Sequence, residues 1–246
     1  AHELTMSGLE VEEIEKIANL DLDSLRDIRD QAAVCFMFLS GMRVGAFVSL
    51  PINCINLKSL RINQFPNAGV LTKNRKSAQT SLYRIPKIIN RVVEWDIRVR
   101  SSLPENAAWY SAIDRIGTNL IPVFPTNSNR STKVNSGILR LCEMTKINYR
   151  SSHKLRHGHV VFGIKNVRDM EGLKAVSMNV MHSSVEITDR VYGGLTSDDI
   201  NEVISNLQPK SDREEVDQEL VKKLADLADI LKNNPKILEL FQKDES

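Results

Sequence analysis

Apolar residues recur along most of the chain with the three-to-four-residue spacing of amphipathic helices. Residues Leu9–Asn19 show this spacing with acids between the apolar positions, and a strongly apolar stretch follows from Asp27 to Leu39. Gly41 ends that stretch, as glycine commonly ends helices, and a further helical segment runs through Leu50. Arg43 is therefore expected at a boundary between two helices, beside the core.

Between Ile55 and Pro86 the pattern changes to short β-favouring pieces separated by polar turns. The predicted pieces are Leu60–Ile62, Gly69–Leu71 and Leu82–Ile85. This region predicts a small antiparallel sheet, with Lys73 at the edge of a turn.

Helical spacing returns after this sheet. The predicted helices are Pro86–Arg100, Thr132–Asn148, one that starts near His153, Asp169–Val180 and Val185–Val191, whereas Leu120–Pro125, with two prolines, is predicted to be an irregular connection. Ser151 or Ser152 is suited to cap the helix near His153. His153 and Arg156, three residues apart, are then expected on one face near its N-terminus, where the helix dipole favours an anion.

These elements predict a mainly α fold with a small antiparallel β-sheet, as one domain over residues 1–207. With 246 residues and 41% hydrophobic content the chain can bury a substantial core. After Pro209 the composition shifts to Ser, Asp, Glu and Lys, and an apolar stripe from Val216 to Leu231 predicts a helical tail over residues 208–246. The last piece, Ile237–Phe241, is too short to bury its four apolar side chains alone, so it either folds back or docks on a neighbouring molecule.

The longest apolar run, Ala32–Met42, is interrupted by Ser40 and is far shorter than the roughly 20 residues that a membrane span needs. No secretion signal is visible at the N-terminus. Cys35, Cys54 and Cys142 form no Cys-x-x-Cys pair and have no metal-ligand spacing. We therefore expect a folded cytoplasmic protein with buried free thiols, no membrane contact and no metal.

Charge is distributed unevenly, although the formal net charge is only +2. Residues 41–100 hold eleven Lys or Arg against two acids, and residues 130–168 hold nine against one. Residues 1–30 carry nine acids against three bases, and residues 208–246 carry ten against seven. A basic middle between acidic ends suits the phosphate backbone of a nucleic acid. The alternative interpretation is that exposed helices simply carry lysines.

Six residues in a fixed order are candidates for chemistry on a phosphodiester. They are Arg43 in Gly41-Met42-Arg43-Val44, Lys73, His153 and Arg156 in His153-Lys154-Leu155-Arg156-His157, His182 in Met181-His182-Ser183-Ser184, and Tyr192 in Arg190-Val191-Tyr192. Arginines and histidines can neutralise the charge that grows on phosphorus, a lysine can protonate a leaving oxygen, and a tyrosine can be the nucleophile.

Read together, these segments closely resemble the tyrosine recombinase and phage-type integrase family, from about Leu9 to about Asn206. The resemblance implies the catalytic-domain fold of the DNA breaking-rejoining enzymes. It assigns roles to six positions: Arg43, Arg156 and His182 as donors to the phosphate oxygens, Lys73 as the general acid, and Tyr192 as the nucleophile of a covalent 3′-phosphotyrosine intermediate. His153 either assists proton transfer or holds the phosphate. Arg75 and Lys76 are rivals of Lys73 for the general acid.

The resemblance further implies a site-specific recombinase that acts on double-stranded DNA without metal, ATP or cofactor. It implies a homotetramer on paired DNA sites, with residues 208–246 passing between neighbours. The N-terminal core-binding domain that family members usually carry is expected to be absent from this chain. Two alternatives are a type IB topoisomerase and a DNA-binding relative without catalysis. The Met181–Ser184 motif and the short tail after Tyr192 disfavour the first, and the second is disfavoured because no site residue is lost.

Overall fold

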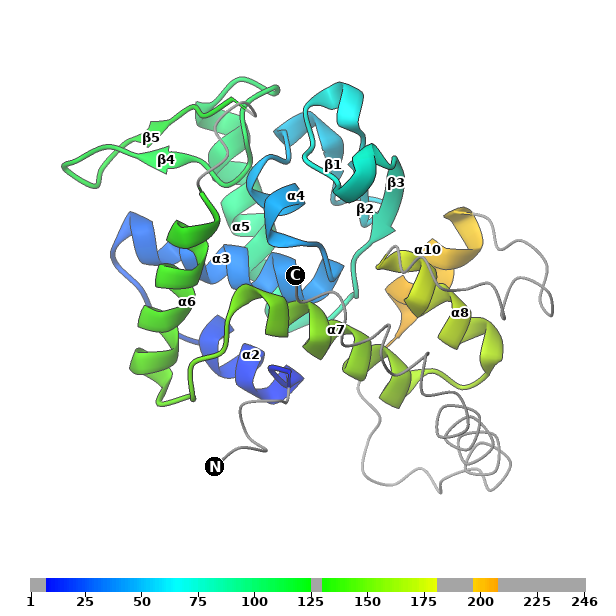
Figure 1. Cartoon of the computed structure of the whole chain (residues 1–246). Coiled ribbons are helices and arrows are strands. Elements are labelled where there is room, and N and C mark those ends of the chain that lie inside the picture. Colours follow the sequence, from blue (N-terminus) through cyan, green and yellow to red (C-terminus); the bar gives the residue numbers. More distant parts are fainter. Residues whose placement is uncertain (1–7, 125–129, 181–196, 208–246) are drawn as a thin grey trace.

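In the computed structural model, which describes residues 8–124, 130–180 and 197–207, the helix α3 (Leu25–Ser40) lies at the centre (Figure 1). Every residue of α3 from Arg29 to Ser40 is buried. The helix starts at Ser24, whose side chain accepts a hydrogen bond from the backbone N–H of Asp27 at 3.1 Å. It ends at Gly41, which has a left-handed φ of 63°.

Several helices pack around α3, and two more lie beside the main sheet (Figure 1). The helices are α2 (Val11–Ala18), α4 (Val44–Val48), α5 (Pro86–Ser102), α6 (Ser131–Thr145), α7 (Ser152–Asn166), α8 (Met170–Asn179) and α10 (Ser197–Asn206). Helices α2, α5, α6 and α7 contact α3 directly, whereas α8 and α10 pack together next to the third strand. The predicted helices that fall on described residues are thus confirmed, with boundaries that move by a few residues. The predicted helices Val185–Val191 and Val216–Leu231 lie outside the described residues.

Two small antiparallel sheets complete the part of the fold that the structure describes. The first has the order β1 (Ile55–Asn56), β2 (Arg61–Gln64) and β3 (Ala78–Ser81), with Arg61 opposite Ser81. The second pairs β4 (Ala112–Ile113) with β5 (Leu120–Ile121), a hairpin that projects from the helices (Figure 1). The predicted fold class, mainly α with a small antiparallel sheet, is confirmed.

Three predictions within these sheets were wrong. Gly69–Leu71 is not a strand, because the chain curls there: Gly69 has a φ of 92°, and the N–H groups of Gly69 and Val70 bond back to Pro66 and Phe65. Leu82–Ile85 lies just beyond β3, since Tyr83 leaves the sheet and donates its backbone N–H to Leu39 at the end of α3. Leu120–Pro125 was predicted to be irregular, yet it begins with β5.

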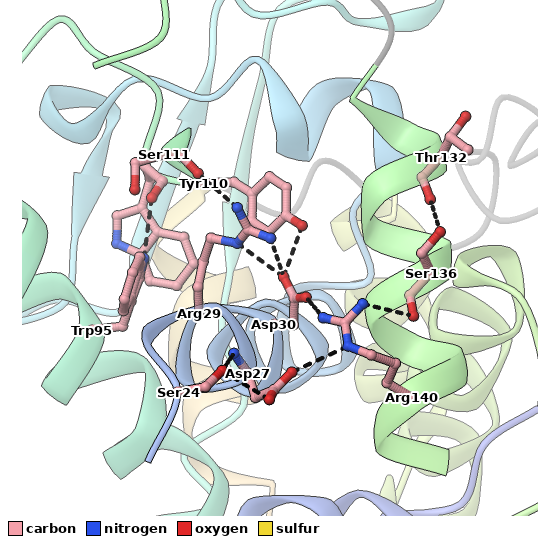
Figure 2. Close-up of polar contacts among 11 residues, drawn as sticks. Ser24, Asp27, Arg29, Asp30, Trp95, Tyr110, Ser111, Thr132, Ser136 and Arg140 are labelled. Carbon is pink, nitrogen blue, oxygen red and sulfur yellow. Dashed lines mark hydrogen bonds and ion pairs between the residues drawn. The ribbon is translucent and has the colours of Figure 1, made fainter. Parts of the chain in front are cut away.

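The buried carboxylate of Asp30 ties α3 to α6 (Figure 2). Its Oδ1 accepts hydrogen bonds from Nε and Nη2 of Arg29 at 2.9 and 2.8 Å and from the hydroxyl of Tyr110 at 2.8 Å, while its Oδ2 accepts one from Arg140 on α6. A Cβ at Gly137 of α6 would lie 2.6 Å from this carboxylate, so glycine permits the close approach. The buried charge is compensated by two cations and a hydroxyl. This network holds α6, the helix that precedes α7, against α3.

The three cysteines are free and buried, as predicted. Burial raises the pKa of the Cys35 thiol to about 12, and burial also raises the pKa of Cys54 and Cys142. These thiols are therefore poor nucleophiles at neutral pH. Among the described residues, no helix is both long enough and apolar enough to cross a membrane.

Candidate active site

The turn after α3 determines where Arg43 lies. Gly41 reverses the chain, and the backbone N–H of Met42 donates to Ser40 Oγ at 3.2 Å. The side chain of Met42 is buried, whereas Arg43 is partly exposed at the N-cap position of α4, where its carbonyl accepts from the N–H of Phe47 at 3.0 Å. Arg43 thus occupies the predicted boundary between two helices, beside the core.

Lys73 lies in a tight turn between β2 and β3. The turn contains two left-handed residues, Asn74 with a φ of 58° and Arg75 with a φ of 54°. Just before it, the N–H of Leu71 donates to Ser49 Oγ at 2.8 Å, and the hydroxyl of Ser49 donates to the carbonyl of Gly45 in α4 at 3.0 Å. Ser49 therefore joins the Lys73 turn to the helix that begins directly after Arg43.

The first turn of α7 carries His153 and Arg156. Ser151 occupies the N-cap position as predicted, but its side chain makes no capping bond. Instead, the N–H of Ser152 donates to Oδ1 of Asn135 on α6 at 2.9 Å. His153 is exposed, whereas Arg156 is only 6% exposed. The Asn135 contact depends on tertiary packing, so the sequence pattern did not reveal it.

Arg156 connects two segments that flank the site. Its Nη1 donates to the carbonyl oxygen of Gly41 at 2.7 Å, and its Nη2 donates to the carbonyl oxygen of Val180 directly after α8. Gly41 lies two residues before Arg43, and Val180 lies two residues before His182. The guanidinium thus holds together the backbone on either side of it.

A cavity of about 710 Å³ brings these segments together. Its basic lining residues are Arg43, Lys73, Arg75, His153 and Arg156, and none of the described residues that line it is acidic. Four of the six predicted site residues therefore meet at one cavity. His182 and Tyr192 lie outside the described residues. Of the two rivals of Lys73, Arg75 shares the cavity lining, whereas Lys76 follows the turn as an exposed residue.

His159, one turn beyond Arg156, is a structural residue behind this cavity. It is fully buried and stacks on Tyr83 with ring centroids 4.2 Å apart. Burial, reinforced by the nearby charge of Arg156, lowers its pKa to about 3, so the ring is neutral at physiological pH. Its Nδ1 lies 2.8 Å from the carbonyl oxygen of Phe38, which assigns the proton to Nδ1.

Two of the other tyrosines are unsuited to nucleophilic attack. Tyr83 and Tyr110 are fully buried, and burial raises the pKa of both phenols; the neighbouring Asp30 raises that of Tyr110 further. Tyr149 is 45% exposed but lies in the connection between α6 and α7, and it is not among the residues that line the cavity. Tyr192 is the fourth tyrosine of the chain.

This basic cavity lies between helices and the connection from β2 to β3, and its described lining contains no acid, which suits a phosphate group or another anion. The sequence profile described as the Phage integrase family matches residues 7–198. The chain therefore belongs to the phage integrase family, the family of the tyrosine recombinases.

Similar proteins include the tyrosine recombinase XerC of Vibrio cholerae, which is 24% identical over 214 residues covering 85% of this chain and 61% of the relative. The XerC of Actinobacillus succinogenes is 25% identical over 207 residues, covering 84% and 62% of the two chains. The chain thus spans about three-fifths of the length of these relatives.

Solved structures show the same fold. The integrase of mycobacterium phage Brujita superposes with a TM-score of 0.53 and 20% identity over 87% of this chain and 62% of that one. The XerA recombinase superposes with a TM-score of 0.51 and 17% identity over 83% and 66% of the two chains. The fold is that of tyrosine recombinase catalytic domains, as predicted.

Proposed function

We propose that this chain is the catalytic part of a site-specific DNA recombinase that cleaves and rejoins strands through a covalent 3′-phosphotyrosine at Tyr192, without metal or ATP. One observation carries the proposal. Arg43, Lys73 and the pair His153 and Arg156 come from three separate parts of the sequence, and all four residues line one cavity whose described lining residues include no acid. That arrangement suits a phosphodiester whose negative charge increases as it is attacked.

Each residue has a defined role in the proposed reaction. The Tyr192 hydroxyl, whose ordinary pKa is about 10, attacks phosphorus as the bond to the 5′ oxygen breaks. Arg43, Arg156 and His182 donate to the non-bridging oxygens, because a planar guanidinium binds phosphate oxygens in pairs. Lys73 gives its proton to the departing 5′ oxygen, and His153 assists transfer of the proton from the tyrosine. The products are a 3′-phosphotyrosine and a free 5′-hydroxyl.

The phosphotyrosine bond retains the energy of the broken phosphodiester, so the reverse attack by a 5′-hydroxyl rejoins the strand without ATP. Double-stranded DNA is the proposed partner. The basic segments 41–100 and 130–168 support this, since they include all five basic residues of the cavity lining. A related fold, the XerH site-specific recombinase, is known bound to its difH substrate; it has a TM-score of 0.50 with 18% identity over 77% of this chain and 50% of that one.

For the chain as a whole we propose a catalytic domain over residues 1–207 and a tail over residues 208–246. Recombination joins two duplexes, so we propose a homotetramer on paired sites, with the tail docking on the neighbouring protomer. The apolar residues of Ile237–Phe241 support this, because so short a segment buries little apolar surface alone.

The proposal is tested by covalent capture from a nicked DNA duplex with a randomised central segment. A nick next to the cleaved phosphate lets the short 5′-hydroxyl fragment diffuse away, which traps the intermediate. We expect detergent-resistant protein–DNA adducts with a common sequence, lost in Tyr192→Phe and retained in the matched control Tyr149→Phe. Persistent adducts in Tyr192→Phe, or none with the unmodified chain, would overturn the proposal.

A further inference from the structure

The side chain of Asn179, the last residue of α8, acts as an additional partner for the edge of β3. Its Oδ1 accepts from the backbone N–H of Ser81 at 2.7 Å, and its Nδ2 donates to the carbonyl oxygen of Ser81 at 3.0 Å. The hydroxyl of Thr80 in turn donates to the carbonyl oxygen of Asn179 at 3.3 Å. Three hydrogen bonds therefore attach the end of α8 to the strand that follows the Lys73 turn.

The residue after Asn179 is Val180, whose carbonyl oxygen accepts from Nη2 of Arg156. Both Asn179 and Val180 are 1% exposed, so solvent does not replace these contacts. The position of the Val180 carbonyl, and with it one hydrogen bond of the Arg156 guanidinium, is thus set by how Asn179 binds Ser81.

His159 lies next to the Asn179 side chain and contacts it. Its Nδ1–H donates to Phe38, so its Nε2 is free to accept, and Nδ2 of Asn179 lies 3.4 Å from it. A Cβ at Gly41 would lie 2.6 Å from Cδ2 of His159 and 2.7 Å from Cγ1 of Val180. The Gly41 turn is therefore packed directly against His159 and Val180. The carbonyl oxygens of Gly41 and Val180 are the two that Arg156 binds.

Filling this space does not by itself require an amide. A buried amide costs free energy unless its hydrogen bonds are satisfied, and leucine has a similar size without that cost. What the amide provides here is a directional link, because a hydrogen-bonded pair to one backbone residue fixes both position and rotation.

We propose that Asn179 is a positioning residue of the active site: it locks the end of α8 onto β3 and thereby holds the Val180 carbonyl, and with it Arg156, in register with the Lys73 turn. This inference rests on the proposed function, since it concerns how the cleavage site is held in shape. Asn179 is linked to Arg156 through the carbonyl of the next residue, Val180, so its proposed effect on cleavage is indirect.

The test compares Asn179→Leu with Asn63→Leu. Asn63 lies on β2 and accepts a hydrogen bond from Gln79 of β3 at 3.0 Å, so its replacement removes an amide from the same sheet without affecting α8. Asn179→Asp is the variant of closest shape: it keeps an acceptor for Ser81 N–H, but a buried carboxyl group replaces the donor to the Ser81 carbonyl oxygen. The substrate is the nicked duplex recovered by covalent capture, used in single-turnover reactions.

A second substrate separates a positioning role from a general loss of folding. In it, a methyl group replaces one non-bridging oxygen of the cleaved phosphate, which removes the negative charge that a guanidinium neutralises. We expect Asn179→Leu to cleave the ordinary substrate about 100-fold more slowly than the unmodified chain, the scale of a 1 Å misplacement. On the methyl-substituted substrate this deficit should shrink to about tenfold or less, with Asn179→Asp intermediate and Asn63→Leu near normal on both substrates.

An activity-free measurement accompanies these rates: hydrogen exchange of the Ser81 amide, which we expect to be protected in the unmodified chain and in Asn63→Leu and to exchange rapidly in Asn179→Leu. Equal deficits on the two substrates, or normal cleavage by Asn179→Leu despite rapid Ser81 exchange, would overturn the positioning role alone. If the unmodified chain forms no adduct, the proposed function and the positioning role both fail, whereas Ser81 exchange still tests the contact. If Asn179→Leu does not fold, Asn179→Asp decides by the same comparison.

Discussion

Arg156 donates a hydrogen bond to the carbonyl oxygen of Gly41 at 2.7 Å across a separation of 115 residues. The same guanidinium donates to the carbonyl oxygen of Val180, so Arg156 links two backbone segments as well as lining the cavity. Arg43, by contrast, is partly exposed at the start of α4. Arg156 therefore contributes to the fold in addition to its proposed role at the phosphate.

Alanine variants of the two arginines test both roles of Arg156. Arg43→Ala and Arg156→Ala should each lower single-turnover cleavage about 100-fold or more, the usual effect of removing a transition-state donor. Arg156→Ala should also lower the free energy of unfolding by about 2 kcal/mol or more, because two buried carbonyls lose a partner. Urea denaturation beside the kinetics checks this; an unchanged free energy of unfolding in Arg156→Ala would contradict the structural role of Arg156.

Of the three candidates for the general acid, Lys73 and Arg75 line the cavity that we propose holds the phosphate. A substrate whose bridging 5′ oxygen is replaced by sulfur has a leaving group that needs no acid. Lys73→Ala should cleave the oxygen substrate at least about 100-fold more slowly and the sulfur substrate almost normally. Rescue of Arg75→Ala or Lys76→Ala by sulfur, without rescue of Lys73→Ala, would show that the assignment to Lys73 is wrong.

The buried His159 predicts a pH dependence of stability. Its pKa is lowered from 6.5 to about 3, so below pH 6.5 the unfolded chain binds a proton that the folded chain does not. Its contribution to stability is therefore complete above about pH 6.5 and falls by about 1.4 kcal/mol per pH unit as the pH decreases toward 3. His159→Phe, which can still stack on Tyr83, should lack this component of the slope. Parallel stability curves for the two proteins between pH 6.5 and 4.5 would refute the assignment.

The sequence predicted the elements that depend on neighbouring residues better than those that depend on contacts between residues distant in the chain. Helix α3 was predicted because its apolar spacing and its terminating Gly41 are both local features of one stretch of sequence. The β4–β5 hairpin was missed because its strands are two residues long and its turn is held by one side chain. Asp114 Oδ1 accepts from the N–H groups of Gly117 and Thr118 at 2.7 and 2.9 Å. The hydrogen bond from the Asn119 side chain is the main reason the Asp114 pKa falls to about 2, and the two backbone donors add to it.

The same distinction holds at the site. Arg43, Lys73, His153 and Arg156 carried signals in ordered motifs, and the structure brings them to one cavity. No sequence pattern marked Asn179 as a site residue, because its proposed role depends on hydrogen bonds to Ser81, 98 residues away. Asn135 and Ser49 were missed for the same reason: each acts through a tertiary contact between elements that no local pattern encodes.

The proposed tail exchange gives a further prediction. Deleting residues 233–246 removes the apolar Ile237–Phe241 segment and should weaken pairing of two DNA sites while binding to one site survives. Native gel shifts with one and two labelled duplexes measure the two steps separately. If the truncated chain pairs sites and recombines like the full chain, the tail does not dock on a neighbour.

The most direct test of the central claim is to identify the residue that carries the DNA. The captured adduct is digested with protease and nuclease, and the peptide that retains a nucleotide is sequenced by mass spectrometry. Our account predicts a 3′-linked nucleotide on the phenolic oxygen of Tyr192, with a free 5′-hydroxyl on the released strand. A nucleotide on any other residue, or a 5′-phosphate linkage, would contradict it.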